Sequence, residues 1–143
     1  MIKDSHGQVS FEYLLIFTVS LIVLIVFTMP LVNQSMKTTV DVSDSIDVKY
    51  DLSKIASAVS TVYGEGQGAK QTVNVQTSKS FKVNVGSSFL YSNLKLEDNK
   101  NKMIKFSYNS NLKSSSLYLH KGENIIVVEW PINSENMVIY SQF

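Results

Sequence analysis

Residues 13–32 form an apolar run, "YLLIFTVSLIVLIVFTMPLV", of 20 residues without a charged side chain. As an α-helix this run would be about 30 Å long, which matches the hydrocarbon core of a bilayer. A cleavable secretory signal peptide has a shorter apolar region that ends in small residues, and the sequence "PLVNQSM" offers no such cleavage site. We therefore expect residues 13–32 to remain on the protein as a transmembrane helix.

The next segment, residues 33–62, is polar with apolar residues at helical spacing. Its apolar stripe recurs at intervals of four, three, four and three residues, at Val48, Leu52, Ile55, Val59 and Val62. Gly64 is a natural end for this helix. Apolar and polar residues also alternate in several places within residues 40–52, so a strand competes there, although we favour a helix. Because Val42 and Ile46 fall opposite the stripe, such a helix would have to bury two faces.

From Gly64 onward the pattern becomes that of short strands separated by turns. A flexible connector, "GEGQGAK", precedes alternating runs near residues 72–77, 81–85, 89–91 with an extension to 96, 103–108, 117–119, 124–130 and 137–140. The expected fold class is α+β, with a long N-terminal hydrophobic and amphipathic helix packed on a small antiparallel β-sheet head. The stripe of the helix would cover one face of the sheet, as is usual for this fold class.

Composition excludes several functional classes. Hydrophobic residues make up 44% of the 143 residues, which excludes a disordered chain. The 13 basic residues are all lysine against 12 acidic residues, and without arginine the chain has no electrostatic footprint for nucleic acid. The absence of cysteine removes disulfides, thiolate metal sites and cysteine nucleophiles.

Other candidate sites have simpler explanations. The glycines of "GEGQG" follow a helix and lack the Gly-Lys-Ser/Thr ending of a phosphate-binding loop, so they form a linker. The aspartates Asp41, Asp44, Asp47 and Asp51 lack the spacing of a calcium loop and are expected on a solvated helix face, with Lys54 placed to pair with Asp51. His120 has no histidine partner in the head. We therefore expect no catalytic residue, no cofactor and no metal site. Asn33 begins the sequon Asn-Gln-Ser and is a candidate for N-glycosylation.

One acid, Glu12, precedes the apolar run within the stretch "GQVSFEYLLIF". Gly7 followed by Gln8, Ser10, Glu12 and Ile16 resembles the class III signal sequence of archaeal type IV pilins, in which Gln-x-Ser-x-Glu-x-x-x-Leu directly follows a glycine. Ile16 stands where leucine is usual. The junction "VYGEGQGAKQTVNV" is similar to the point in these pilins at which the long helix ends and the first strand begins. Together these matches cover about a quarter of the chain, and the remaining head is matched only in architecture.

The resemblance implies that a prepilin peptidase cuts between Gly7 and Gln8 and removes residues 1–7 as a leader. His6 stands where the family often has lysine or arginine. Residues 8–62 would form the long helix, with residues 13–32 as membrane anchor and then filament core, and residues 63–143 would form the head. The implied partners are further copies of the chain in a helical filament, the peptidase, and the pilus assembly ATPase with its membrane platform. The implied location is the cell membrane for the precursor and an extracellular surface filament for the mature subunit.

Glu12 needs a partner in an apolar environment, because insertion of an ionised carboxylate costs roughly 2–3 kcal/mol. Cleavage would create an α-amino group on Gln8 of every copy, and this amine could pair with Glu12 of a neighbour. At about 4 Å and an effective dielectric of 20 the attraction is roughly 4 kcal/mol, which fixes register more than it adds stability. Cyclisation of Gln8 would abolish that charge. A simpler alternative is that Glu12 reaches the headgroups from the first turn of a signal anchor.

Four readings of the function remain open from the sequence. The favoured reading is a non-enzymatic structural pilin that serves in surface adhesion. A minor or initiating pilin would share every feature discussed above. A monomeric, membrane-anchored surface module would need Glu12 only at the interface. An archaeal flagellin shares the plan of helix and β head but usually lacks the Gln-x-Ser-x-Glu pattern.

Overall fold

The computed structural model describes residues 5–96 and 100–142, with side chains described from Ser10 onward. One helix precedes seven strands: α1 (Ser5–Glu65), β1 (Lys70–Thr77), β2 (Phe81–Val85), β3 (Phe89–Lys95), β4 (Asn101–Ser107), β5 (Ser115–Leu119), β6 (Gly122–Glu129) and β7 (Val138–Gln142). The chain divides into two compact units, Met1–Thr39 and Val40–Phe143. The second unit contains the C-terminal part of α1 together with all the strands.

The first unit is helical throughout its described residues, and its apolar side chains are exposed. Phe11, Leu24 and Phe27 are 66%, 63% and 70% exposed. The other large apolar side chains up to Val32 are also exposed, each by at least 44%. The hydroxyls of Thr18 and Thr28 donate to the carbonyl oxygens of residues 14 and 24, four positions earlier. These polar groups are therefore satisfied within the helix, as an apolar environment requires. The helix also continues through Pro30.

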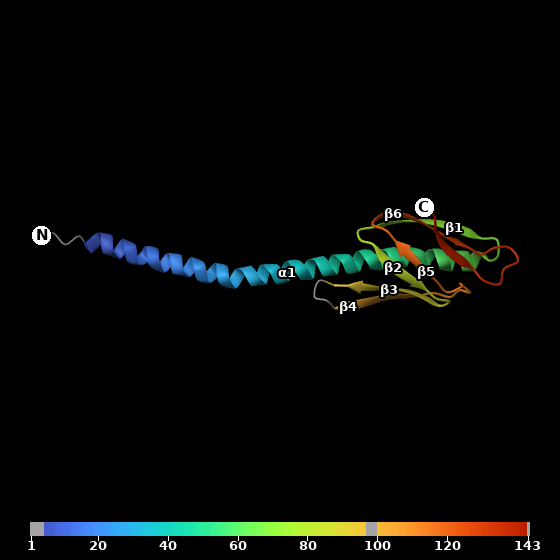
Figure 1. The fold of residues 1–143 in the computed structure, drawn as a ribbon, viewed down its shortest axis with the longest axis horizontal. Helices are drawn as coiled ribbons and strands as arrows, with labels where there is room; N and C mark the ends of the chain where they lie inside the picture. The colour runs from blue at the N-terminus through green and yellow to red at the C-terminus, as the bar shows by residue number, and fades with distance from the viewer. Residues whose placement is uncertain (1–4, 97–99, 143) are drawn as a thin grey trace. The chain divides into compact units, whose positions relative to one another are not determined.

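In the second unit the strands form two antiparallel sheets. One has the order β1-β6-β7 and the other the order β4-β3-β2-β5. In Figure 1, β1 and β6 lie on one side of α1, and β3 and β4 lie on the other. The expected α+β class is confirmed, and the strands divide between two sheets that share one helix.

The core of this unit is built from the predicted helical stripe and the inner faces of both sheets. Leu52, Ile55, Val59 and Val62 are fully buried, and they belong to one hydrophobic cluster with residues of both sheets. Ala56 and Ala58 are buried as well, so the buried side of the helix is wider than a single stripe. A helix covered by one sheet needs only a narrow apolar face, whereas two sheets close over a broader arc of this helix.

The competition between helix and strand in residues 40–52 is resolved in favour of the helix. The prediction that the helix buries a second face, the one with Val42 and Ile46, is wrong for the single chain. These two side chains are 51% and 59% exposed. The expected strands all occur, with ends that shift by no more than two residues in most cases. The predicted turn that starts at residue 97 falls partly on residues 97–99, which lie outside the described residues.

The helix ends later than the sequence predicted. It runs to Glu65, and the residue that stops it is Gly66, with φ of +91°. The Gly66 amide donates to the Val62 carbonyl at 3.1 Å, which satisfies one of the last carbonyls of the helix. Tyr63 stacks on Trp130, with ring centroids 5.7 Å apart, and fixes this end of the helix against the chain that follows β6.

Candidate functional site: the N-terminal segment and the acidic helix flank

The predicted processing residues lie at the start of α1. Gly7 and Gln8 are within the helical backbone, and their side chains lie outside the described residues. Ser10, Glu12 and Ile16 are exposed on the same helix. Gln8, Glu12 and Ile16 are four residues apart, so they occupy neighbouring positions along one side of the helix. Cleavage after Gly7 is not tested by this arrangement and stays a prediction.

Glu12 is the one charged side chain between Ser10 and Val32. Within the described part of the chain, no hydrogen bond or ion pair reaches its carboxylate. The apolar side chains around it are not covered by other described residues, so within the described part of the chain this segment carries a large exposed apolar surface with one unpaired acid. Monomeric soluble proteins rarely expose apolar patches of this extent, so a bilayer or other chains must cover this surface.

The described residues contain one helix that is long and apolar enough to cross a bilayer, judged by length and composition. Its apolar part coincides with the predicted transmembrane run. A signal sequence near the N-terminus meets the same criterion, so this property supports insertion into a membrane without distinguishing an anchor from a signal.

The candidate glycosylation residue, Asn33, is exposed and lies within α1. The neighbouring hydroxyl of Thr38 donates to the carbonyl of Gln34, as expected for a continuous helix. Sequons that are used in secreted proteins usually lie in surface loops. The use of Asn33 stays a prediction.

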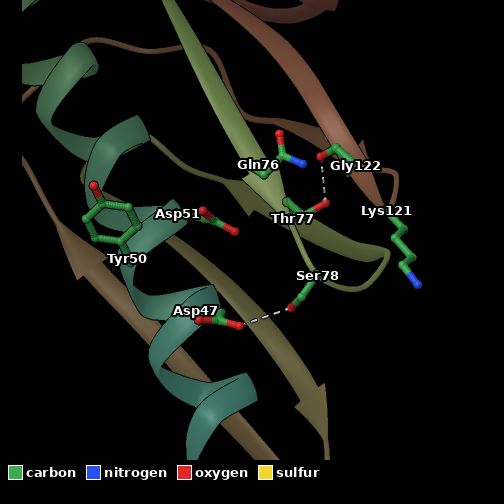
Figure 2. Close-up of a pocket in the computed structure, with 8 residues that line it drawn as sticks. All are labelled: Asp47, Tyr50, Asp51, Gln76, Thr77, Ser78, Lys121 and Gly122. Atoms are coloured by element: carbon green, nitrogen blue, oxygen red, sulfur yellow. Dashed lines mark hydrogen bonds between the residues drawn. The ribbon is translucent and has the colours of Figure 1, made fainter.

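A second polar region lies on the flank of α1 that faces the end of β1 and the turn before β6 (Figure 2). A hollow of about 380 Å³ is lined there by Asp47, Tyr50, Asp51, Gln76, Thr77, Ser78, Lys121 and Gly122. The Ser78 hydroxyl donates to Asp47 at 3.2 Å, and Lys79 forms an ion pair with Asp44. Asp47 is exposed, in agreement with the predicted solvated face.

Asp51 differs from this prediction, because its side chain is buried, with 3% of the residue exposed. Desolvation raises the pKa of Asp51 from 3.8 to about 6, Lys54 lowers that pKa, and Asp47 raises it. The predicted pairing of Asp51 with Lys54 is not formed, because the Lys54 ammonium lies over the Tyr50 ring, 4.6 Å from its centroid. Within the described residues, Asp51 accepts no hydrogen bond.

The burial of Asp51 was missed from the sequence, although a signal was present. Asp51 is three residues after Val48 and four before Ile55, which places it on the border of the apolar stripe. No group of three or more histidine, cysteine or acidic residues suited to a metal ion occurs in the described ranges 5–96 and 100–142.

Comparison with known families gives one match. Residues 5–31 match the family model described as Class III signal peptide. This match supports a type IV pilin-like prepilin or an archaeal flagellin-like precursor, and together with the apolar helix it indicates membrane insertion and secretion. The comparisons with curated proteins and with solved structures return no match.

Proposed function

We propose that this protein is the structural subunit of an archaeal type IV pilus. The precursor is inserted in the membrane and cleaved after Gly7 by a prepilin peptidase. Its N-terminal helix then polymerises into the core of a helical surface filament that serves in adhesion. An assembly ATPase and a membrane platform act as separate partners, and the subunit itself has a structural rather than an enzymatic role.

One observation supports this proposal: Glu12, which has no hydrogen bond or ion pair among the described residues, lies in an exposed apolar helix, and residues 5–31 of that helix match the Class III signal peptide family. In a filament, the apolar side chains of residues 13–32 pack against those of neighbouring copies. The amine made by cleavage at Gln8 then lies at the same helical end as Glu12 of the next copy. An ion pair there contributes roughly 4 kcal/mol of attraction at 4 Å and a dielectric of 20, and desolvation offsets much of it.

The first test is mass spectrometry of the N-terminus in protein from membranes and from sheared surface filaments. We expect the filament fraction to begin at Gln8, either as a free amine or as a cyclised residue. An intact Met1 in both fractions would contradict processing, and a chain absent from every filament would contradict the structural role.

The second test is the variant Glu12→Gln, which retains the shape of the side chain and removes its charge. We expect membrane insertion to persist and surface filaments to be lost. Ser20→Ala, an uncharged change on the same exposed helix, is the matched control and should assemble normally. Normal filaments built from the Glu12→Gln chain would show that the charge of Glu12 is not needed for assembly, whereas filaments that lack this chain would favour a monomeric, membrane-anchored surface module.

Two related roles share the N-terminal features. An archaeal flagellin-like subunit is supported by the class III signal peptide itself. A minor or initiating pilin would occur in few copies. The ratio of this chain to the main subunit in purified filaments therefore distinguishes that role from the proposed role as the main structural subunit.

A further inference from the structure

The hollow beside Asp51 has the features of a site for a positively charged group. Figure 2 shows the Asp51 carboxylate pointing from α1 into the hollow, with Asp47 one turn away on the same helix. Asp51 is 3% exposed, and no donor among the described residues reaches it. Burial of a carboxylate without a compensating partner is unfavourable, so a positive group that entered this hollow would be stabilised there.

The opposite flank of α1 carries lysines around an exposed apolar surface. A second hollow, of about 410 Å³, is lined by Val42, Ser45, Ile46 and Lys49 of α1 and by Lys102, Met103, Ile104 and Lys105 of β4. Met103 is 61% exposed, and Val42 and Ile46 are also more than half exposed. We call this surface, with its three lysines, the basic flank, and the hollow with Asp47 and Asp51 the acidic flank.

The two flanks face away from each other. Ile46 and Asp51 are five residues apart, which corresponds to about 140° around a helix with 3.6 residues per turn. The elements that border the flanks, β4 and β6, lie on different sides of α1 in Figure 1. Two complementary surfaces on different sides of one body form a heterologous contact, which repeats from copy to copy instead of closing a symmetric dimer.

We propose that the basic flank of one copy docks on the acidic flank of the next, with a lysine ammonium entering the hollow beside Asp51 and Asp47. This inference rests on the proposed polymer and names a contact of its heads. A lysine fits because its flexible stem can bring a compact charge to the carboxylates of the hollow, and lysine is the basic residue that this chain contains. Tyr50, which is 62% exposed at the acidic flank, would cover the exposed Met103 of the neighbour.

Other occupants explain less of the structure. A metal ion would find two carboxylates in the hollow, and no group of three or more histidine, cysteine or acidic residues suited to a metal ion occurs among the described residues. An anionic lipid surface would bind the lysines of the basic flank but would leave Asp51 buried without a partner. A second copy satisfies both flanks at once.

The test is a charge exchange, scored by the amount of surface filament in cells that produce the wild-type chain or one of its variants. Lys102→Glu combined with Lys105→Glu should reduce filaments at least tenfold, and Asp47→Lys alone should reduce them as well. The three changes together should restore part of the lost filaments, because the lysine introduced at position 47 then faces the two introduced glutamates. These positions are exposed, so the variants are expected to fold.

Lys82→Glu is the matched control, since it makes the same change of charge at an exposed position of β2 in the same sheet. It should leave filaments unchanged. If the wild-type chain forms filaments and the Lys102→Glu, Lys105→Glu variant assembles equally well, the proposed contact is wrong. The proposed function would remain intact in that case. Failure of the charge exchange to restore assembly, or loss of wild-type filaments in a chelator, would overturn it in favour of another occupant. The absence of wild-type filaments would overturn the proposed function itself.

Discussion

Replacement of Asp51 by asparagine should stabilise the folded subunit at neutral pH. The pKa of Asp51 rises from 3.8 to about 6 on folding, mainly because burial disfavours the charged form. A difference of about two pKa units corresponds to roughly 3 kcal/mol at 1.36 kcal/mol per unit. Water in the adjoining hollow screens part of this penalty. We therefore expect Asp51→Asn to raise the free energy of unfolding at pH 7.5 by about 1–3 kcal/mol.

The sign of the pH dependence follows from proton binding. The folded state holds the Asp51 proton more tightly than the unfolded state, so this carboxyl favours folding more strongly as pH falls from about 7 to about 4. The other charged groups that line the same hollow are Asp47 of α1 and Lys121 before β6, and Lys54 of α1 also lowers the pKa of Asp51. The advantage of the asparagine variant should therefore shrink between pH 7.5 and pH 5 and should be small near pH 4.

The assay is urea unfolding of the full chain in mild detergent, followed by the fluorescence of the single tryptophan, Trp130. This residue stacks on Tyr63 and so reports whether the end of α1 stays docked. Glu135→Gln is the control, because Glu135 is exposed and its replacement should change stability by less than about 0.5 kcal/mol. A destabilised Asp51→Asn variant at pH 7.5, or a gain that does not depend on pH, would refute this reasoning. The same variant should weaken assembly if the acidic flank receives a lysine, so stability and assembly should change in opposite directions.

Two further changes test the packing and the end of the helix. Leu52→Ala removes a fully buried side chain and should lower the free energy of unfolding by about 2–5 kcal/mol. Val42→Ala is the control: Val42 is 51% exposed, so this change should cost less than about 0.5 kcal/mol in the same urea titration. Gly66→Ala should cost about 1–2 kcal/mol, because the residue at φ +91° adopts a conformation that L side chains avoid although no atom obstructs the new methyl group. Gly64→Ala should instead stabilise the folded protein by about 0.5–1 kcal/mol, since Gly64 lies within α1 with open space around it. Equal effects of the two glycine changes on the free energy of unfolding would contradict the assignment of the helix end.

Local sequence patterns predicted most of the elements of this protein. The apolar run and the stripe from Val48 to Val62 predicted the helix, because helical periodicity depends on residues three and four apart. Alternation predicted the strands for the same reason. The candidate processing residues around Glu12 followed from a resemblance to the class III signal sequence and stay a prediction, while a Class III signal peptide family model matches residues 5–31.

Features that depend on distant residues required the tertiary structure. The order of the strands and their division into two sheets depend on which edges pair, and edges separated by tens of residues leave no periodic signal. The burial of Asp51 depends on the end of β1 and the turn before β6, which close over one border of the helical stripe. Likewise, lysines on β4 join apolar residues of α1 in one flank only because the chain brings segments more than fifty residues apart into contact. The sequence by itself therefore determined an apolar helix with one acid at its start and a β-rich head, because these follow from local spacing. The tertiary structure decided which charges face outward and which acid is buried without a hydrogen bond from any described residue, because burial is set by segments that meet only in the folded chain.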